Sequence, residues 1–455
     1  MLLIKNGFIV SDVDTYKADI LIEDGKIKEI GKNLKVDCEI IDAEGKYVIP
    51  GAVDAHTHFD LQAGDCRAVD DFYTGSVAAV CGGTTTIIDH IAFGPKNCSL
   101  HHQIEEYHKL ADQKSVVDYS FHGVIQHVNE NILKEIKEVI ESGISSLKLY
   151  MTYDFKLNDA EILQVLKQAK ENKGIVAVHA ENHDVINHLR EKFLTNGKID
   201  PIYHAYSRPN ECEAEAINRM IYLSELAGDA PLYIVHLSTE EGLEEIKAAR
   251  QRGLKNIFVE TCPQYLTLTE KEYLKENREG LKFIMSPPLR KEKDIEALWR
   301  GVNNGDIQVI ATDHCPFNFS KEKQLGKDDF TKCPNGAPGV EERVNIIFSE
   351  GVKKGRISIN KFVEVMCTNP SKIYGCYPQK GTLLPDSDAD IVIIDGNKNR
   401  IITKKELHSA VDYSLYEGKE VFGEIELVIQ RGEIIVKNNK FLGKKGNGKF
   451  LKRKI

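Results

Sequence analysis

The chain has 455 residues, of which 42% are hydrophobic and 28% are charged, and its net charge is −9. This composition excludes collagen-like, disordered and disulfide-scaffold proteins, and the acidic balance disfavours a nucleic-acid-binding surface. The first residues lack a signal-peptide pattern, no apolar run approaches about 18 residues, and the ten cysteines have no CxxC spacing. We therefore expect a cytoplasmic protein with reduced thiols, no membrane span and a small-molecule partner.

Both ends of the chain carry short strand patterns with hairpin turns. Residues 18–30 alternate around Asp24-Gly25, a dipeptide typical of a type I′ turn, and residues 426–438 turn at Arg431-Gly432. Such signals indicate antiparallel pairing. We predict one small β-sandwich domain that is built from both termini and spans residues 1–50 and 376–455.

The middle of the chain, residues 51–375, alternates short apolar runs with helical patterns. Eight alternations are typical of a parallel (β/α)8 barrel, although an open doubly wound sheet is the alternative. Helical patterns cover residues 101–113, 129–141, 158–172, 211–227 and 239–252. The eight apolar runs that we predict as barrel strands are residues 47–56, 84–90, 116–125, 145–151, 174–180, 231–238, 256–262 and 307–314.

The final segment, residues 444–455, holds six basic residues. A basic end of this kind is usually a solvated arm or one that packs against another subunit. We predict one of these two arrangements for the tail.

Ligand-type side chains stand at the predicted strand ends or, for one lysine, in mid-strand. In a (β/α)8 barrel the carboxyl ends of the strands form the active face. One histidine at a strand end is more often a hydrogen-bonded side chain than a ligand, an aspartate there often caps a helix, and a lysine often extends to solvent. The joint pattern instead predicts a metal site made of His56, His58, Lys148, His179, His236 and Asp313.

Lys148 lies in the run SSLKLYM, with its side chain on the inward face of the predicted strand. An ammonium group among metal ions is repelled, and burial favours the neutral amine. A neutral amine can add carbon dioxide and become an anionic carbamate with two oxygens. We therefore predict that Lys148 is carboxylated (N6-carboxylysine) and bridges two divalent ions.

Such a site predicts hydrolysis. Two ions hold a water between them and lower its pKa, and the resulting hydroxide attacks a carbonyl group. Asp313 is placed to accept the proton and to deliver it to the leaving nitrogen. Tyr153, just beyond the strand that carries Lys148, is the candidate donor to the developing oxyanion, with loop packing as its alternative role.

The motifs that carry these residues resemble the hydantoinase/dihydropyrimidinase branch of the amidohydrolase superfamily, nearly from end to end. The phrases IIDHIAFGP, DYSFHGVIQH and YHAYSRPNECEAEAI are most similar to the D-phenylhydantoinase group within it. The motifs are GAVDAHTHFD (51–60), GGTTTIID (82–89), SLKLYMTY (146–153), VHAEN (178–182), VHLS (235–238), ETCPQYL (260–266), MSPPLR (285–290), ATDHCPF (311–317) and NGAPGVEER (335–343).

The resemblance implies a (β/α)8 barrel with a β-sandwich, two divalent metal ions (usually zinc, with manganese as an alternative) and a homotetramer. It implies that His56, His58 and Asp313 bind the first ion and that His179 and His236 bind the second. It further implies that carboxylated Lys148 bridges the ions, that Tyr153 is the oxyanion donor, and that Ser286 and Asn335 hold the cyclic amide ring.

Several other polar residues lie near the same barrel face without an expected ligand role. We assign His183 to the loop or helix after His179. Cys315 is expected to be a packed thiol rather than a nucleophile. His90, His122, His127 and His314 are expected to be polar or structural neighbours of the site.

The expected reaction is ring opening of 5-substituted hydantoins, most simply D-enantiomers with aromatic substituents, to N-carbamoyl amino acids. Dihydropyrimidinase is the alternative, and allantoinase stays harder to exclude by motif. Dihydroorotase is disfavoured because Asp60 stands where it has an arginine, and Arg67 and Arg290 do not match that position. A metal-free scaffold of the dihydropyrimidinase-related kind is disfavoured because all six ligand positions are kept.

The ring substituent is expected to enter a pocket formed by loops beyond the first, second and fourth strands. A small side chain there leaves room for a phenyl group, and aromatic side chains stack on it. Ordinary loop packing is the alternative. The residues concerned are Leu61, Ala63, Phe93, Tyr150 and Phe155.

Overall fold

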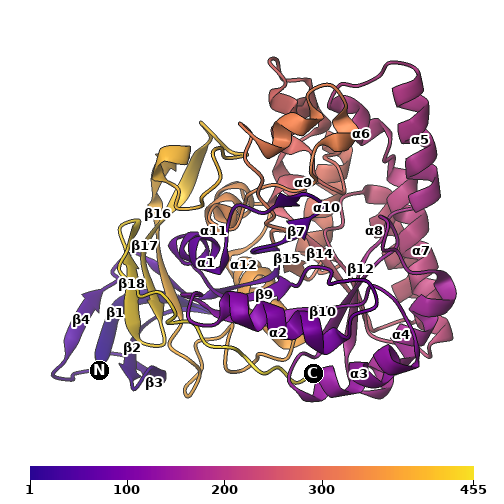
Figure 1. Ribbon diagram of the computed structural model, residues 1–455. Coiled ribbons are helices and arrows are strands. Elements are labelled where there is room, and N and C mark those ends of the chain that lie inside the picture. Colours follow the sequence, from indigo (N-terminus) through magenta and orange to yellow (C-terminus); the bar gives the residue numbers. More distant parts are fainter.

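A computed structural model describes all residues, 1–455. The central part of the chain forms an eight-stranded parallel sheet in the order β15-β14-β13-β12-β11-β10-β9-β6. Figure 1 shows this sheet surrounded by helices, with the sheet from both termini beside it. The strands are β6 (Ala52–Thr57), β9 (Thr84–His90), β10 (Asp118–Val124), β11 (Ser146–Tyr150), β12 (Ile175–His179), β13 (Leu232–Ile234), β14 (Ile257–Thr261) and β15 (Val309–Ile310).

The first and last strands of this sheet close it into a barrel. Beyond the end of β15, the Asp313 N–H donates to the His56 carbonyl at 2.9 Å, and the His58 N–H donates to the His314 carbonyl at 2.9 Å. A parallel bridge joins Thr57 to His314 at the same place. The prediction of a (β/α)8 barrel is therefore confirmed, and the doubly wound sheet is excluded.

Both termini build a nine-stranded sheet in the order β19-β18-β17-β16-β5-β1-β2-β3, with β4 paired to β1. It is one continuous hydrogen-bonded sheet wrapped around its own 15-residue apolar core, rather than two separate sheets. Its strands are β1 (Leu2–Val10), β2 (Thr15–Glu23), β3 (Lys26–Gly31), β4 (Glu39–Asp42), β5 (Tyr47–Pro50), β16 (Ile391–Ile401), β17 (Glu420–Gln430), β18 (Glu433–Lys437) and β19 (Lys440–Phe441).

The two predicted hairpin turns in this sheet are present. Asp24 and Gly25 join β2 to β3 with φ values of 50° and 78°. Arg431 and Gly432 join β17 to β18 with φ values of 44° and 78°. Positive φ at both central residues is the geometry of a type I′ turn, which matches the twist of the flanking strands.

The predicted strand over residues 47–56 is wrong as a single element. Its first part is β5, which pairs with β1 and β16 in the terminal sheet, and its second part is β6 in the barrel. Gly51 lies between them and packs so closely on Thr85 that a Cβ atom would stand 2.1 Å from the threonine hydroxyl. The chain changes sheets at this glycine, which an uninterrupted apolar run does not reveal.

Helices follow the barrel strands on the outside, as predicted, and most begin at a capping side chain. Asn158, for example, accepts from the N–H groups of Ala160 and Glu161. The helices are α1 (Phe72–Cys81), α2 (Leu100–Ala111), α3 (Glu130–Glu141), α4 (Asp159–Glu171), α5 (His183–Thr195), α6 (Ile202–Tyr206), α7 (Asn210–Leu226), α8 (Glu240–Gln251), α9 (Pro263–Thr267), α10 (Glu292–Asn304), α11 (Arg343–Ile347), α12 (Ile359–Val363) and α13 (Asn369–Ile373).

Shorter elements complete the list. Five are 3₁₀ helices and two, η5 and η6, are π-helical turns in the region after the barrel. None of the helices combines the length and apolar character needed to cross a membrane. These elements are β7 (Gln62–Ala63), β8 (Cys66–Arg67), η1 (Glu270–Leu274), η2 (Glu279–Phe283), η3 (Glu322–Gly326), η4 (Phe330–Lys332), η5 (Phe348–Lys353), η6 (Glu364–Thr368) and η7 (Lys404–Glu406).

The C-terminal tail is not a solvated arm, so that half of the prediction is wrong, while packing against another subunit stays a prediction. In Figure 1 it ends beneath the barrel near α3. The Leu451 N–H donates to the Tyr119 carbonyl at 2.7 Å, and the Arg453 N–H donates to the Gly143 carbonyl at 2.8 Å. Leu451 joins the apolar cluster inside the barrel, and Arg453 is 2% exposed. The tail therefore covers the amino-terminal end of its own barrel.

Candidate metal centre and active-site cavity

A cavity of about 560 Å³ opens at the carboxyl ends of the barrel strands. This volume suits a small organic molecule. The structure brings every residue that the sequence assigned to the site to this one cavity. Its lining includes His56, His58, Lys148, Tyr153, His179, His236, Ser286, Asp313 and Asn335.

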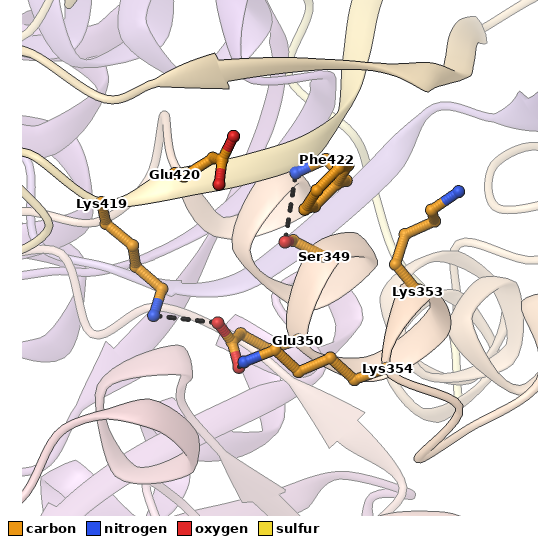
Figure 2. Close-up of a pocket in the computed structure, with 7 residues that line it drawn as sticks. All are labelled: Ser349, Glu350, Lys353, Lys354, Lys419, Glu420 and Phe422. Atoms are coloured by element: carbon orange, nitrogen blue, oxygen red, sulfur yellow. Dashed lines mark hydrogen bonds and ion pairs between the residues drawn. The ribbon is translucent and has the colours of Figure 1, made fainter.

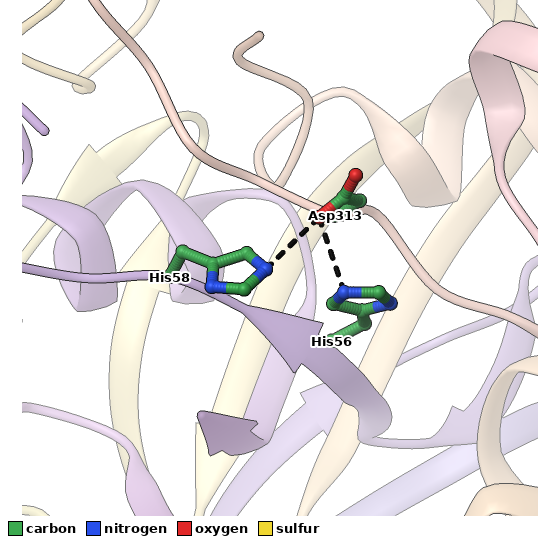
Figure 3. A group of neighbouring side chains, drawn as sticks. All are labelled: His56, His58 and Asp313. Carbon is green, nitrogen blue, oxygen red and sulfur yellow. Dashed lines mark ion pairs between the residues drawn. The ribbon is translucent and has the colours of Figure 1, made fainter. Parts of the chain in front are cut away.

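The first ligand group consists of His56, His58 and Asp313 (Figure 3). Both histidines come from β6 or its end and point at the aspartate, which lies on the segment after β15. The Nε2 atoms of His56 and His58 lie 3.1 and 3.0 Å from the same Asp313 oxygen, Oδ1. Nitrogen and oxygen donors converging on one point suit a divalent metal ion.

Glu260, on β14, orients the first of these histidines. Its Oε1 atom lies 2.6 Å from His56 Nδ1 and also accepts from the His236 N–H at 3.1 Å. A carboxylate on one ring nitrogen fixes the proton there and leaves the other nitrogen free to bind metal. Sequence reasoning did not assign this role to Glu260, although an acidic residue within a buried strand was the available signal.

The second ligand group consists of His179 at the end of β12 and His236 after β13. Nδ1 of His179 and Nε2 of His236 face each other at 2.9 Å, and both rings are buried. Glu181 Oε2 lies 2.7 Å from the other nitrogen of His179, and Arg208 pairs with the same carboxylate. Glu181 thus orients the ring of His179 as Glu260 orients the ring of His56. The sequence analysis did not assign this role to Glu181.

Lys148, on β11, lies among both groups and is 1% exposed. After burial, which is the largest cause, the Lys148 charge also contributes to the lowered pKa values of His58, His179 and His236, so it lies within electrostatic reach of both pairs. Burial lowers the pKa of the Lys148 amine to about 8. A substantial neutral fraction at physiological pH is what the addition of carbon dioxide requires.

Electrostatics favour the metal-binding forms of most of these side chains. Burial lowers the pKa values of His58, His179 and His236, which keeps the rings neutral. Burial also lowers the pKa of His56, but Glu260 and Asp313 outweigh it and raise the value to about 9. Burial would raise the pKa of Asp313, yet His56 and His58 hold it well below its usual range. Asp313 is therefore a carboxylate.

Two of the predicted strand-end residues lie beyond their strands. β13 stops at Ile234 and β15 at Ile310, two and three residues before His236 and Asp313. His236 has a φ of 41° and Asp313 a φ of 56°, and Tyr153 has a φ of 72°. Non-glycine residues rarely adopt such backbone, which is concentrated at functional sites. Local bends of the chain, rather than regular strands, aim these side chains.

The part of the cavity beyond the ligands is largely aromatic. The rings of Phe93, Tyr150 and Phe155 lie together, with Phe93 and Tyr150 centroids 5.3 Å apart and Tyr150 and Phe155 centroids 5.4 Å apart. Leu61 and Ala63 line the same cavity. The five residues expected to form a substituent pocket therefore share one space. Ser286 is buried there with no hydrogen-bond partner for its hydroxyl group.

The other histidines near the site differ in their contacts. His183 begins α5 and lines the cavity. His314 lies 2.9 Å from Asp70 and accepts from two backbone N–H groups. His122 contacts the Ala55 carbonyl at 2.9 Å, its ring stacks on that of His90, and His127 Nε2 has no partner.

Cys315 lines the cavity, and burial raises the pKa of its thiol. It is therefore protonated, as a packed thiol should be, and all ten cysteines are free.

Arg67 binds Asp60 at 2.7 Å, and Arg290 donates to Ser238; neither arginine lines the cavity. Neither of these two arginines therefore takes the position expected for a dihydroorotase, and Asp60 stands at the sequence position where that enzyme has its arginine.

A second cavity, of about 360 Å³, lies where η5 meets β17 (Figure 2). Lys354 and Lys419 both pair with Glu350, at 2.7 and 2.9 Å, and the Phe422 N–H donates to the Ser349 hydroxyl. Glu350 thus partly neutralises the charges of these two lysines. None of the predicted site residues lies there, so the chemistry belongs to the barrel cavity.

Comparison with known proteins agrees with this geometry. Residues 47–435 match the model of the amidohydrolase family. The chain is 50% identical to a D-phenylhydantoinase of Escherichia coli O1:K1, over 99% of this chain and 98% of that protein.

Solved structures give the same result. Dihydropyrimidinase from Brevibacillus agri NCHU1002 is 45% identical with a TM-score of 0.97, and the match covers 99% of this chain and 98% of that one. D-hydantoinase from Bacillus sp. AR9 is 45% identical with a TM-score of 0.97, covering 100% and 99%. The amidohydrolase family is generally metal-dependent. This chain belongs to the amidohydrolase family.

Proposed function

We propose that this chain is a metal-dependent cyclic amidase that opens the ring of 5-substituted hydantoins to give N-carbamoyl amino acids. The observation that carries the proposal is the pair of histidine groups around one buried lysine, at the base of a cavity with an aromatic wall. The similarity to D-phenylhydantoinase and D-hydantoinase supports the same reaction.

The donor set fits two divalent ions. Glu260 and Glu181 each occupy one nitrogen of a ligand-type histidine, which leaves His56 Nε2 and His179 Nδ1 free to bind metal. His56, His58 and Asp313 would hold one ion, and His179 and His236 the other. Carboxylated Lys148 would join them. Imidazole and carboxylate donors favour zinc, with manganese as the alternative.

When bound, such ions lower the pKa of a coordinated water and polarise the ring carbonyl. Asp313 supplies the proton-transfer group, because its ionised carboxylate can accept a proton and deliver it to the leaving ring nitrogen. Burial raises the pKa of Tyr153, so its hydroxyl group stays protonated and can donate to the carbonyl oxygen as negative charge develops. Ser286 and Asn335 would hold the ring amides.

The aromatic wall supports a preference for aryl substituents. Phe93, Tyr150 and Phe155 offer ring faces and edges, and Ala63 leaves space beside them. A D-enantiomer preference follows from the resemblance to D-phenylhydantoinase. Dihydropyrimidinase activity is the second candidate, since the Brevibacillus agri structure bears that name and its fold is superimposable on this one. A non-catalytic scaffold is disfavoured by the complete donor set.

We also propose a homotetramer and a cytoplasmic location. The homotetramer follows from the family resemblance. The cytoplasmic location follows from the ten free cysteines, which are consistent with a reducing compartment.

Metal analysis together with a hydrolysis assay tests the proposed function. We expect about two zinc or manganese ions per chain after loading in the presence of bicarbonate, and ring opening of 5-phenylhydantoin that stops when a chelator removes them. Protein that binds no metal after supplementation would be a scaffold rather than an enzyme.

A further inference from the structure

One face of α5 forms a polar part of the active-site cavity that the ring-opening reaction does not use. His183, Asn187 and Arg190 all line the cavity. Their spacing of four and three residues places them on the same side of the helix. Asn187 Nδ2 lies 2.9 Å from His183 Nε2, so these two side chains are held together. Arg190 continues this row of N–H donors by one more turn.

The guanidinium group of Arg190 has no ion-pair partner. Its one hydrogen bond goes to the Thr331 carbonyl at 3.3 Å, which leaves most of its donors free. Asp154 and Asp329 lie close enough to influence its charge, but neither forms an ion pair with it. Burial lowers the pKa of Arg190, as expected for a partly buried cation that lacks a bound carboxylate.

Arg208, which lines the same cavity, shows the contrasting arrangement. It is 2% exposed and pairs with the buried carboxylate of Glu181, so its charge is compensated. Its Nε atom nevertheless has no hydrogen-bond partner. This unpartnered donor is buried and belongs to a residue that lines the cavity, so a ligand in the cavity is one source of its missing acceptor. Because the charge of Arg208 is neutralised by Glu181, the uncompensated positive charge in this part of the cavity is that of Arg190.

We propose that Arg190, supported by Asn187 and His183, forms an anion-binding subsite for hydantoins whose 5-substituent ends in a carboxylate. A guanidinium group binds a carboxylate through two parallel hydrogen bonds, which gives both affinity and orientation. The cavity thus accepts two kinds of substituent, aryl groups on the ring cluster of Phe93 and Phe155 and acidic chains on α5. This inference rests on the proposed ring-opening activity.

A structural role is the competing explanation, because Arg190 also tethers the segment around Thr331. The two roles are separated by a pair of substrates with the same shape and different charge. 5-(2-Carboxyethyl)hydantoin and 5-(2-carbamoylethyl)hydantoin differ only in a terminal carboxylate or amide. A loosened segment affects both, whereas a lost ion pair affects the acid alone.

The test measures kcat/KM for both substrates and for 5-phenylhydantoin. In Arg190→Gln we expect kcat/KM for the acid to fall about tenfold, the usual effect of losing a hydrogen bond to a charged group. The amide and phenyl substrates should change less than about twofold. Arg190→Lys should recover part of the loss. Lys192→Gln removes one charge from an exposed position of the same helix and is the matched control.

Calorimetric titration with the ring-opened products, the N-carbamoyl acid and its amide, gives a readout that needs no turnover. Wild-type protein should bind the acid more tightly than the amide, and Arg190→Gln should lose this difference. Equal losses on all substrates, or an unchanged acid-to-amide ratio in either assay, would overturn the subsite. Failure to open 5-phenylhydantoin would refute the proposed function instead, and the titration would still decide the subsite.

Discussion

The two ends of the barrel differ in how their buried functional and charged side chains are compensated. At the carboxyl end, buried polar atoms lack partners, among them Nδ1 of His58 and of His236 and the Ser286 hydroxyl. Backbone at His236 and Asp313 is left-handed. Unpartnered buried polar atoms and left-handed backbone destabilise a folded protein. They are retained where a bound ligand supplies the missing interactions.

At the amino-terminal end, the buried charges of Arg453 and Lys380 are fully partnered. Arg453 donates to the hydroxyl groups of Ser120 and Ser146 at 2.8 and 2.9 Å, and also to the Phe121 and Tyr374 carbonyls. Lys380 lies 2.5 Å from Asp118 and 2.8 Å from Asp390. One end is therefore built for stability and the other for binding, and substitutions at the two ends should separate these properties.

The largest effect is expected for Lys148→Ala. Without the bridging side chain the ions are not retained, so turnover should fall at least about 10³-fold, with partial rescue by propionate in place of the carbamate. The melting temperature of the metal-free protein should change little, because removal of a costly buried amine offsets the loss of its buried methylene groups. Metal analysis, activity and thermal melting check this. Lys173→Ala, at an exposed lysine, is the control. If Lys148→Ala retained two ions, the proposed bridging role of carboxylated Lys148 would be wrong.

Tyr153→Phe should keep its metal ions and lose roughly 10²–10³-fold in kcat, the usual loss for one oxyanion donor. The hydroxyl group acts on charge that develops during the reaction, so KM should change much less. Steady-state kinetics with 5-phenylhydantoin and metal analysis provide the measurement. Tyr206→Phe, at an exposed position, should behave as wild type. A loss below about threefold would remove Tyr153 from this role.

Arg453→Ala tests the opposite end of the barrel. The substitution leaves two serine hydroxyls and two carbonyls short of a donor, so the free energy of unfolding should fall by about 3 kcal/mol. The kcat of the folded fraction should stay close to that of wild type. Denaturant unfolding and activity at low temperature check both expectations. Lys452→Ala removes the exposed neighbouring charge. Similar stability of both variants would show that the tail does not seal the barrel.

A smaller effect is expected from His204 on α6, whose Nε2 lies 2.7 Å from the Met285 carbonyl. Burial lowers the pKa of His204 from 6.5 to about 3. The unfolded chain therefore takes up a proton below pH 6.5 that the folded protein does not, and stability falls as pH drops from about 6.5 toward about 3. Wild type should lose about 2 kcal/mol through this group at pH 5.

His204→Gln should lack this loss. Unfolding at pH 7.5 and pH 5, with a chelator present throughout, measures it, and His188→Gln is the control at an exposed position. An equal pH dependence in wild type and His204→Gln would show that His204 is protonated in the folded protein.

Much of the fold could be predicted because it depends on local sequence patterns. Alternating apolar runs and helical stretches indicated the barrel, and two dipeptides indicated the hairpins. The division at Gly51 could not be predicted, because its cause is close packing against Thr85, a contact outside its own strand. The tail was misjudged because a basic segment normally stays in water, and the partners of Arg453 come from other parts of the chain.

The candidate site was predictable to the extent that strand ends converge in a barrel. The ligand-type residues stand out because histidine, lysine and aspartate are unusual there. Glu181 and Glu260 were missed because their role depends on which histidine nitrogen they face, a matter of three-dimensional contact. The row on α5 was missed for a related reason. Its spacing is visible in the sequence, but the direction in which that face points is not.

The central claim is that the carboxyl end of the barrel is a ring-opening site for aryl hydantoins. The most direct test is the initial rate of ring opening of D- and L-5-phenylhydantoin and of dihydrouracil, with protein loaded with zinc or manganese in bicarbonate. We predict fast opening of the D-phenyl substrate and slow opening of dihydrouracil. A preference for dihydrouracil would contradict the account of the aromatic wall, and no opening of any of the three would contradict the proposed function itself.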